Sequence, residues 1–143
     1  MHIPALYPSR DEFRALAARG NLVPVYAELP ADLDTPLSAF LRLRPGPYAF
    51  LLESVEGGEK WARYSFLGSD PFMVLSAKDD RLTLRGADGK TERLPAGNPL
   101  AALRGLLARF HPVAVPGLPR FQGGAVGYLA YDAVRHIERL PRT

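Results

Sequence analysis

An acidic residue and a hydroxyl close an apolar stretch of this chain, at a place where packing alone would not favour them. The stretch ends in Leu51-Leu52-Glu53-Ser54. A carboxylate such as that of Glu53 can bind an ammonium group, whereas the Ser54 hydroxyl and the Arg63 guanidinium can bind a carboxylate. Apolar neighbours for the rest of such a ligand are Leu52, Tyr64 and Phe66. The pattern indicates a pocket for a small, partly apolar, charged ligand such as an amino acid.

The same residues have a second interpretation, which the pattern leaves open. A carboxylate at the end of a strand can simply reach solvent, and a serine there can make a local turn hydrogen bond. An arginine on a strand, such as Arg63, is usually exposed. Residue types alone therefore do not decide between a pocket and an ordinary strand end.

No other group of residues predicts catalysis or metal binding. The three histidines, His2, His111 and His136, lie at unrelated spacings without a ligand pattern. Gly123-Gly124-x-x-Gly127 lacks the Lys-Ser/Thr ending of a phosphate-binding loop. Glycines in a strand more often permit a bulge or a close backbone approach. We expect no catalytic residue, no metal and no cofactor in these 143 residues.

The central part of the chain reads as an antiparallel meander. Tyr48 to Val55 is continuously apolar at its start, which predicts a strand covered on both faces. Residues 56–59 turn the chain, and Trp61 to Leu67 returns as an antiparallel strand. Asp88-Gly89 is a tight hairpin signal. The further predicted strands are Pro71 to Ala77, Arg81 to Arg85 and Thr91 to Leu94.

Three helices are predicted around these strands. Ser9 and Glu12 form a capping box that starts a helix over Arg10 to Arg19. Thr35-Pro36 and Asn98-Pro99 each place a capping side chain before a proline, which starts a helix. The apolar stripe of the last helix consists of Leu100, Leu103, Leu106, Leu107 and Phe110.

The remaining segments are assigned from their prolines and glycines. Asn21 to Leu29 reads as a strand, at a sheet edge because it contains Pro24. His111 to Pro119 is an irregular connector. Phe121 to Asp132 reads as a glycine-rich strand that passes into a short helical segment, and apolar surface is expected along it.

Composition fits a globular protein of ordinary size. The chain has 47% hydrophobic and 23% charged residues, no cysteine and a net charge of +3. Its start resembles neither a signal nor a transit peptide, and no apolar run is long enough to span a bilayer, so we expect a cytoplasmic protein. The arginines are scattered along the sequence. A nucleic-acid-binding face would need its basic groups on one stripe or among exposed aromatics, and none is expected.

Two blocks resemble the N-terminal half of anthranilate synthase component I, a chorismate-utilising enzyme. The first comprises Leu51 to Glu56, Arg63 to Gly68 and Asp70-Pro71-Phe72. The second is Phe121-x-Gly123-Gly124-x-Val126-Gly127-Tyr128-x-x-Tyr131-Asp132, followed by Glu138 and Leu140-Pro141. The blocks lie in the family's order, and together they span nearly the whole chain.

The resemblance implies a regulatory site. In that family the Leu-Leu-Glu-Ser segment forms part of the allosteric L-tryptophan site. Carried over, Ser54 is the strongest candidate, followed by Glu53, Leu52 and then Arg63. The paired glycines and Tyr128 are implied to be structural, at the junction with the second half of the family's chain.

The resemblance also implies a fold and partners. The expected fold is α+β, an antiparallel β-sheet with flanking helices that forms one half of a two-sheet sandwich. The chorismate-binding domain, with the catalytic groups and magnesium-binding glutamates, is expected to lie outside these 143 residues, which alone would be inactive. The expected partners are that C-terminal half, a glutamine amidotransferase subunit (component II) that supplies ammonia, and tryptophan as inhibitor.

Three alternatives remain open at this stage. The first is the same half of aminodeoxychorismate synthase component I, a sister enzyme of the folate pathway. The second is a standalone amino-acid-binding module without any enzyme. The third is an anion- or RNA-binding domain, which the scattered arginines disfavour.

Overall fold

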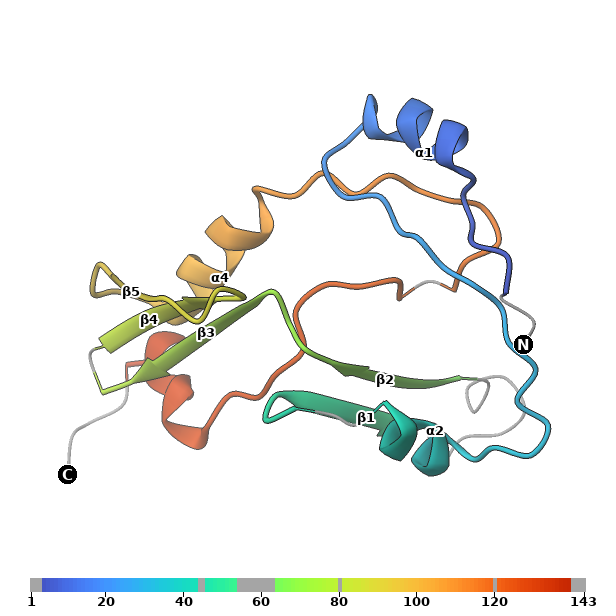
Figure 1. The fold of residues 1–143 in the computed structure, drawn as a ribbon. Coiled ribbons are helices and arrows are strands. Elements are labelled where there is room, and N and C mark those ends of the chain that lie inside the picture. Colours follow the sequence, from blue (N-terminus) through green and yellow to red (C-terminus); the bar gives the residue numbers. More distant parts are fainter. Residues whose placement is uncertain (1–3, 44–45, 54–63, 80, 120, 140–143) are drawn as a thin grey trace. The chain divides into compact units, whose positions relative to one another are not determined.

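The chain has an α+β fold in which short helices accompany antiparallel sheets (Figure 1). The predicted fold class is confirmed. The chain divides into two compact units, one formed by Met1–Leu29 with Gly97–Thr143 and the other by Pro30–Ala96. The computed structural model describes residues 4–43, 46–53, 64–79, 81–119 and 121–139.

We call the unit Pro30–Ala96 the central unit. Its first sheet is a two-stranded antiparallel pair. Strand β1 (Ala49–Glu53) pairs with β2 (Ser65–Ser69), so the predicted antiparallel return is confirmed. The predicted turn at residues 56–59 lies outside the described residues. Gly68 faces Phe50 across the pair, and a Cβ at Gly68 would lie 2.7 Å from the Phe50 ring. A larger residue at Gly68 would force the Phe50 ring to move.

The second sheet contains strands β3 (Met73–Lys78), β4 (Arg81–Gly86) and β5 (Thr91–Leu94), in that order and antiparallel. The three predicted strands are confirmed within a few residues, but the single meander is wrong, because β2 does not pair with β3. Asp70 has a φ of 52°, and Pro71 after it has no N–H for a strand ladder. The chain leaves one sheet at this point and starts another.

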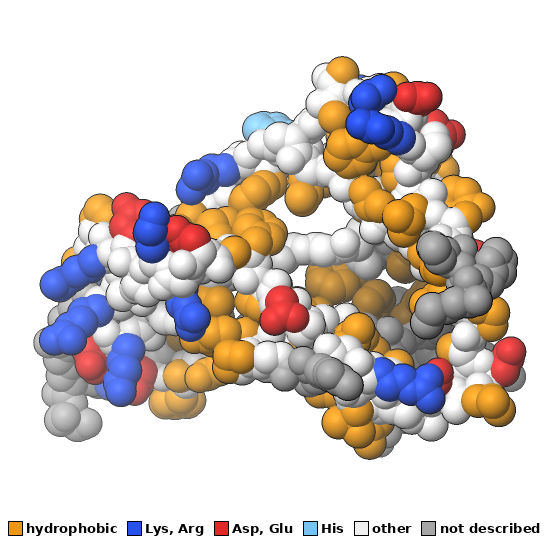
Figure 2. All heavy atoms as spheres, in the orientation of Figure 1, with side chains coloured by type: hydrophobic (Ala, Val, Ile, Leu, Met, Phe, Trp, Pro, Cys, Tyr) orange, Lys and Arg blue, Asp and Glu red, His pale blue; other side chains and the backbone are white. Residues whose placement is uncertain are grey.

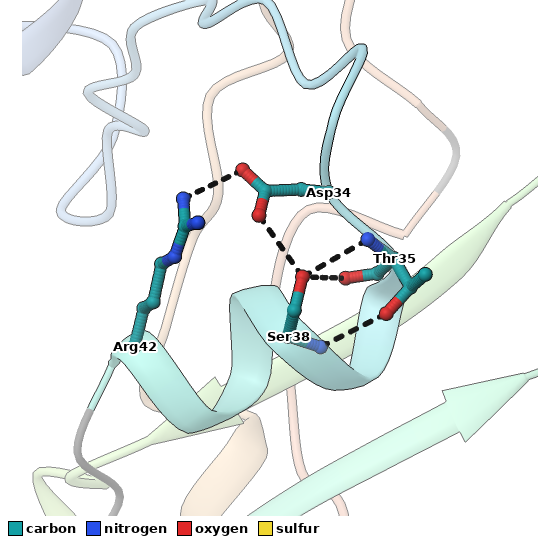
Figure 3. A network of polar contacts seen from close by, with 4 residues as sticks. All are labelled: Asp34, Thr35, Ser38 and Arg42. Atoms are coloured by element: carbon teal, nitrogen blue, oxygen red, sulfur yellow. Dashed lines mark hydrogen bonds and ion pairs between the residues drawn. The ribbon is translucent and has the colours of Figure 1, made fainter.

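Helix α2 (Pro36–Arg42) packs against both β1 and β2, and a polar network fixes its start (Figure 3). Thr35 and Ser38 form a reciprocal capping box. The Ser38 hydroxyl donates to Asp34 at 2.9 Å, and Arg42 reaches the other Asp34 oxygen at 2.8 Å. The predicted helix start is confirmed.

The other unit contains α1 (Arg10–Ala17), α4 (Pro99–Leu107) and a 3₁₀-helix, η1 (Tyr131–His136). Both helix starts were predicted correctly, and the Ser9 and Asn98 caps are present. The helices end earlier than predicted, at Ala17 and at Leu107. The chain continues past each end in single turns, such as Phe110 N–H to Leu107 O at 3.0 Å.

Two predicted strands of this unit are wrong. Residues 21–29 make only isolated bridges, Leu22 to Pro112 and Tyr7 to Tyr26, because Pro24 interrupts a ladder. The described residues of the segment from Phe121 to Ala130 form no strand. Gly123 and Gly124 have φ values of 150° and 142°, which side chains rarely adopt. The helical segment predicted after it is confirmed as η1.

Few side chains of the described residues are buried. Only Leu82 and Val113 among them are buried, and β1 is not covered on both faces as predicted, since Leu52 is 50% exposed. Hydrophobic side chains lie on the surface in Figure 2. The accessible surface is 12552 Å², whereas two separate folded proteins of half this mass would expose about 8,800 Å². The chain thus presents a large area that is suited to contact with other protein.

The glycine-rich segment contributes to this area. Tyr128 and Tyr131 are 93% and 88% exposed, and Leu129 is 61% exposed. The apolar surface predicted along this segment is confirmed, although the strand is not.

Candidate functional site

The register of the β1–β2 pair decides which candidate residues share a face. Leu52 lies opposite Phe66, and Glu53 lies opposite Ser65. Successive strand residues point to opposite faces of a sheet. Leu52 and Phe66 therefore share one face, and Glu53 and Ser65 share the other.

The Leu52 face is apolar and aromatic. Tyr64 precedes Phe66 by two residues, and their rings are 6.0 Å apart at an angle of 31°. Leu52 and Tyr64 are about half exposed. Leu52, Tyr64 and Phe66 thus form the apolar group predicted from the sequence, open enough to contact the side chain of a ligand.

Of the polar residues predicted for the site, the structure describes Glu53 alone. Glu53 is exposed and forms no ion pair within the described part of the chain. Ser54 and Arg63 lie outside the described residues. Because Glu53 and Leu52 lie on opposite faces, one ligand can contact both only around the end of the strand. The four site residues stay predictions.

Contacts at the start of the β1–β2 pair fix its position in the unit. The Arg85 guanidinium lies 5.8 Å from the centre of the Tyr48 ring, next to the start of β1. The Ser69 hydroxyl donates to Asp70 at 2.9 Å. Helix α2 packs on both strands of the pair.

A depression of about 340 Å³ lies in the other unit between α1 and residues 114–116. Its side chains include Tyr7 and Tyr26, whose rings are 5.7 Å apart. Glu12 also lines it, and hydrogen bonds from the Ser9 hydroxyl and N–H lower the pKa of Glu12. No spacing pattern joins these distant residues in the sequence, so sequence analysis missed this depression.

Other kinds of site are not found in the described residues. Over those ranges, no three His, Asp or Glu side chains are grouped so as to hold a metal ion. Nor does any described helix have the length and apolarity needed to cross a membrane. Leu52 and Glu53 line neither this depression nor a smaller one beside the β3–β4 turn.

Comparison with known proteins identifies relatives along almost the whole chain. It is 46% identical over 135 residues to anthranilate synthase component 1 of Acetivibrio thermocellus, covering 94% of this chain and 27% of that protein. It is 47% identical over 132 residues to that of Pseudomonas aeruginosa, covering 92% of this chain and 27% of that protein. The chain is homologous to the N-terminal part of anthranilate synthase component 1.

A third relative supports the same homology. The anthranilate synthase component 1 of Synechocystis is 47% identical over 136 residues, covering 94% of this chain and 27% of that protein. The chain thus spans 27% of the length of these relatives. No family model and no solved structure matches it. The resemblance predicted from the two sequence blocks is confirmed.

Proposed function

We propose that this chain is the tryptophan-sensing N-terminal part of an anthranilate synthase component 1. The complete protein would convert chorismate and ammonia to anthranilate and pyruvate in tryptophan biosynthesis, in the cytoplasm. The single observation that carries the proposal is the homology to proteins of that name over more than nine-tenths of the chain.

The geometry of the β1–β2 pair fits a role in binding rather than in catalysis. Leu52, Tyr64 and Phe66 offer an aromatic and apolar surface of the kind that an indole ring contacts. Glu53, at the end of the same strand, supplies a carboxylate for an α-ammonium group. Ser54 and Arg63 would bind the α-carboxylate. Tryptophan would bind at this end of the pair.

The proposed partners are supported by the names and the greater length of the relatives and by the exposed apolar side chains. The rest of component 1 would carry the chorismate site, with magnesium, and cover some of these side chains. Component II, the glutamine amidotransferase, would supply ammonia. Tryptophan would inhibit by binding one arrangement of the complete protein more tightly than another, since a ligand shifts an equilibrium only through such a difference.

Two alternatives predict different results. Aminodeoxychorismate synthase component I would give a para-substituted product, whereas anthranilate is ortho-substituted, so product analysis of the complete enzyme separates them. A standalone amino-acid-binding module would bind tryptophan fully without the rest of component 1. The names of the relatives favour anthranilate synthase.

Calorimetric titration with L-tryptophan tests the proposal. We expect saturable binding to the full-length protein and a loss of about tenfold in affinity in Glu53→Gln, because a hydrogen bond to a charged group is worth roughly 1.5–3 kcal/mol and the neutral hydrogen bond that Gln can still accept is worth about 1 kcal/mol. Glu92→Gln, another exposed strand glutamate, is the matched control and should bind like the wild type. Binding that is absent, or equally weak in both variants, would contradict the proposal.

A further inference from the structure

The β3–β4–β5 sheet separates its side chains by charge in a way that the sequence did not reveal. The register pairs Lys78 with Arg81 and Ser76 with Thr83 across β3 and β4. It also pairs Thr83 with Arg93 across β4 and β5. Because strand side chains alternate between faces, all five side chains lie on one face of the sheet, which we call the basic face.

The basic face carries no acidic strand residue. Arg85 also belongs to it, opposite Val74 and Thr91. The one acidic strand residue, Glu92, lies on the other face with Leu84. That other face is apolar and contains the buried Leu82. Its members on the strands are Met73, Leu75, Ala77, Leu82, Leu84, Gly86, Glu92 and Leu94.

Four cations of the basic face lie close together. Directly opposed residues have Cβ atoms about 5 Å apart and diagonal ones about 7–8 Å, so Arg93 is a diagonal neighbour of both Arg81 and Arg85. Lys78, Arg81 and Arg93 are exposed and form no ion pair within the described residues. Like charges directly opposite each other destabilise a sheet, and an anion bound between them would remove this cost.

The β3–β4 end of the basic face is also hollowed. A depression of about 180 Å³ is lined by Ser76, Lys78, Asp79, Arg81 and Thr83. One water needs only about 15 Å³ of such space, so there is room for a larger anion. Two hydroxyls and two cations can all donate hydrogen bonds into this space.

We propose that the basic face binds a multivalent phosphate anion, with its strongest contacts at Lys78 and Arg81. A phosphate group carries a charge of about −1.5 to −2, against −1 for a carboxylate, and offsets more of the repulsion among these cations. Arg binds phosphate oxygens in a bidentate manner. Linked phosphates can contact several cations of the face at once. This site is separate from the proposed tryptophan site and does not depend on it.

Calorimetric titration of the full-length protein with sodium tripolyphosphate tests the site, without tryptophan and without divalent ions. We expect saturable binding that weakens as salt screens the cations. Arg81→Gln should raise the Kd about fivefold, from the loss of one close charge pair in water. Arg81 is exposed, so its replacement leaves the buried Leu82 in place.

Two further variants make the test specific. Lys90→Gln removes the same charge from the neighbouring β4–β5 turn, where Lys90 lies 3.4 Å from Asp88, and should change the Kd less than about twofold. Asp79→Asn removes the acid that lines the depression and should tighten binding. Asn also tolerates the φ of 47° at this turn position.

Three results would overturn the proposal. The first is the absence of saturable binding. The second is an equal effect of Lys90→Gln and Arg81→Gln, which would show a response to net charge alone. The third is tighter binding of an oligothymidylate than of tripolyphosphate at equal phosphate concentration, which would assign the face to a nucleic-acid strand instead.

Discussion

The two sheets of the central unit differ in how far their apolar side chains are buried within this chain. In the β3–β4–β5 sheet, apolar and polar residues alternate, and the apolar face contains the buried Leu82. In the β1–β2 pair, Leu51 and Leu52 follow each other along the strand, yet Leu52 is 50% exposed. Alternation is typical of a sheet with one solvated face, and a continuous apolar run is typical of a strand covered on both.

This difference indicates where the chain needs further contacts. Within β1, Phe50 and Leu51 are half-buried and Leu52 is exposed, and an exposed apolar side chain favours contact with a partner or a ligand over contact with water. The β1–β2 pair carries the proposed tryptophan residues, so the exposed Leu52 and the proposed regulatory site belong to the same pair. The second sheet can form its apolar face without that partner.

The largest expected effect is on the free energy of unfolding, when one leucine in each sheet is replaced by alanine. Leu82→Ala should lower the free energy of unfolding by about 2–4 kcal/mol, because it removes a buried side chain. Leu52→Ala, on an exposed site, should cost less than about 1 kcal/mol in the 143-residue chain. Urea denaturation measures both. Equal losses would show that Leu52 is packed as fully as Leu82 and would contradict the difference between the two sheets.

A medium effect is expected inside the β1–β2 pair itself. Gly68→Ala should destabilise it by about 1–3 kcal/mol, because the added methyl would overlap the Phe50 ring, 2.7 Å away. Gly97→Ala is the matched control, since no atom lies within 4 Å of a Cβ built there. Amide hydrogen exchange of β1 and β2 should quicken only in Gly68→Ala. Unchanged exchange would mean that the ring moves aside at no cost.

The smallest effect concerns α2, which packs on the β1–β2 pair. Asp34→Ala removes the partner of both Ser38 and Arg42, and the Asp34 side chain is only 19% exposed. We expect a loss of about 1 kcal/mol, measured by urea denaturation. Asp11→Ala breaks the exposed pair with Arg14, where Asp11 is 92% exposed, and should cost close to nothing. A larger loss from Asp11→Ala would contradict this ranking.

Local signals in the sequence predicted the fold well. The helix starts at Ser9, Thr35 and Asn98 depend on capping side chains a few residues away, and all three are present. The hairpin around Asp88-Gly89 depends on two turn residues, and β4 and β5 flank it as predicted. Such features need no knowledge of distant parts of the chain.

The failures involve partners far along the chain. Residues 21–29 and the segment after Phe121 have strand-like composition, but strands exist only where another strand pairs with them, which composition does not show. The bridge from Leu22 to Pro112 joins positions about ninety residues apart. The same limit hid the basic face, because its cations gather only once the strand register is known.

The candidate site was predictable in part. The apolar group of Leu52, Tyr64 and Phe66 was predicted from residue types and is present in the structure. Strand alternation places Glu53 and Leu52 on opposite faces of the β1–β2 pair, so the two side chains do not line one face together. The identity of the ligand comes from resemblance, and Ser54 and Arg63 stay predictions.

The most direct measurement is anthranilate formation by the full-length protein with component II, titrated with L-tryptophan. We expect inhibition in the wild type and in Glu92→Gln, and a concentration for half-inhibition that is about tenfold higher in Glu53→Gln, with unchanged activity in the absence of tryptophan. Equal inhibition of Glu53→Gln and the wild type would contradict the assignment of this strand end to tryptophan.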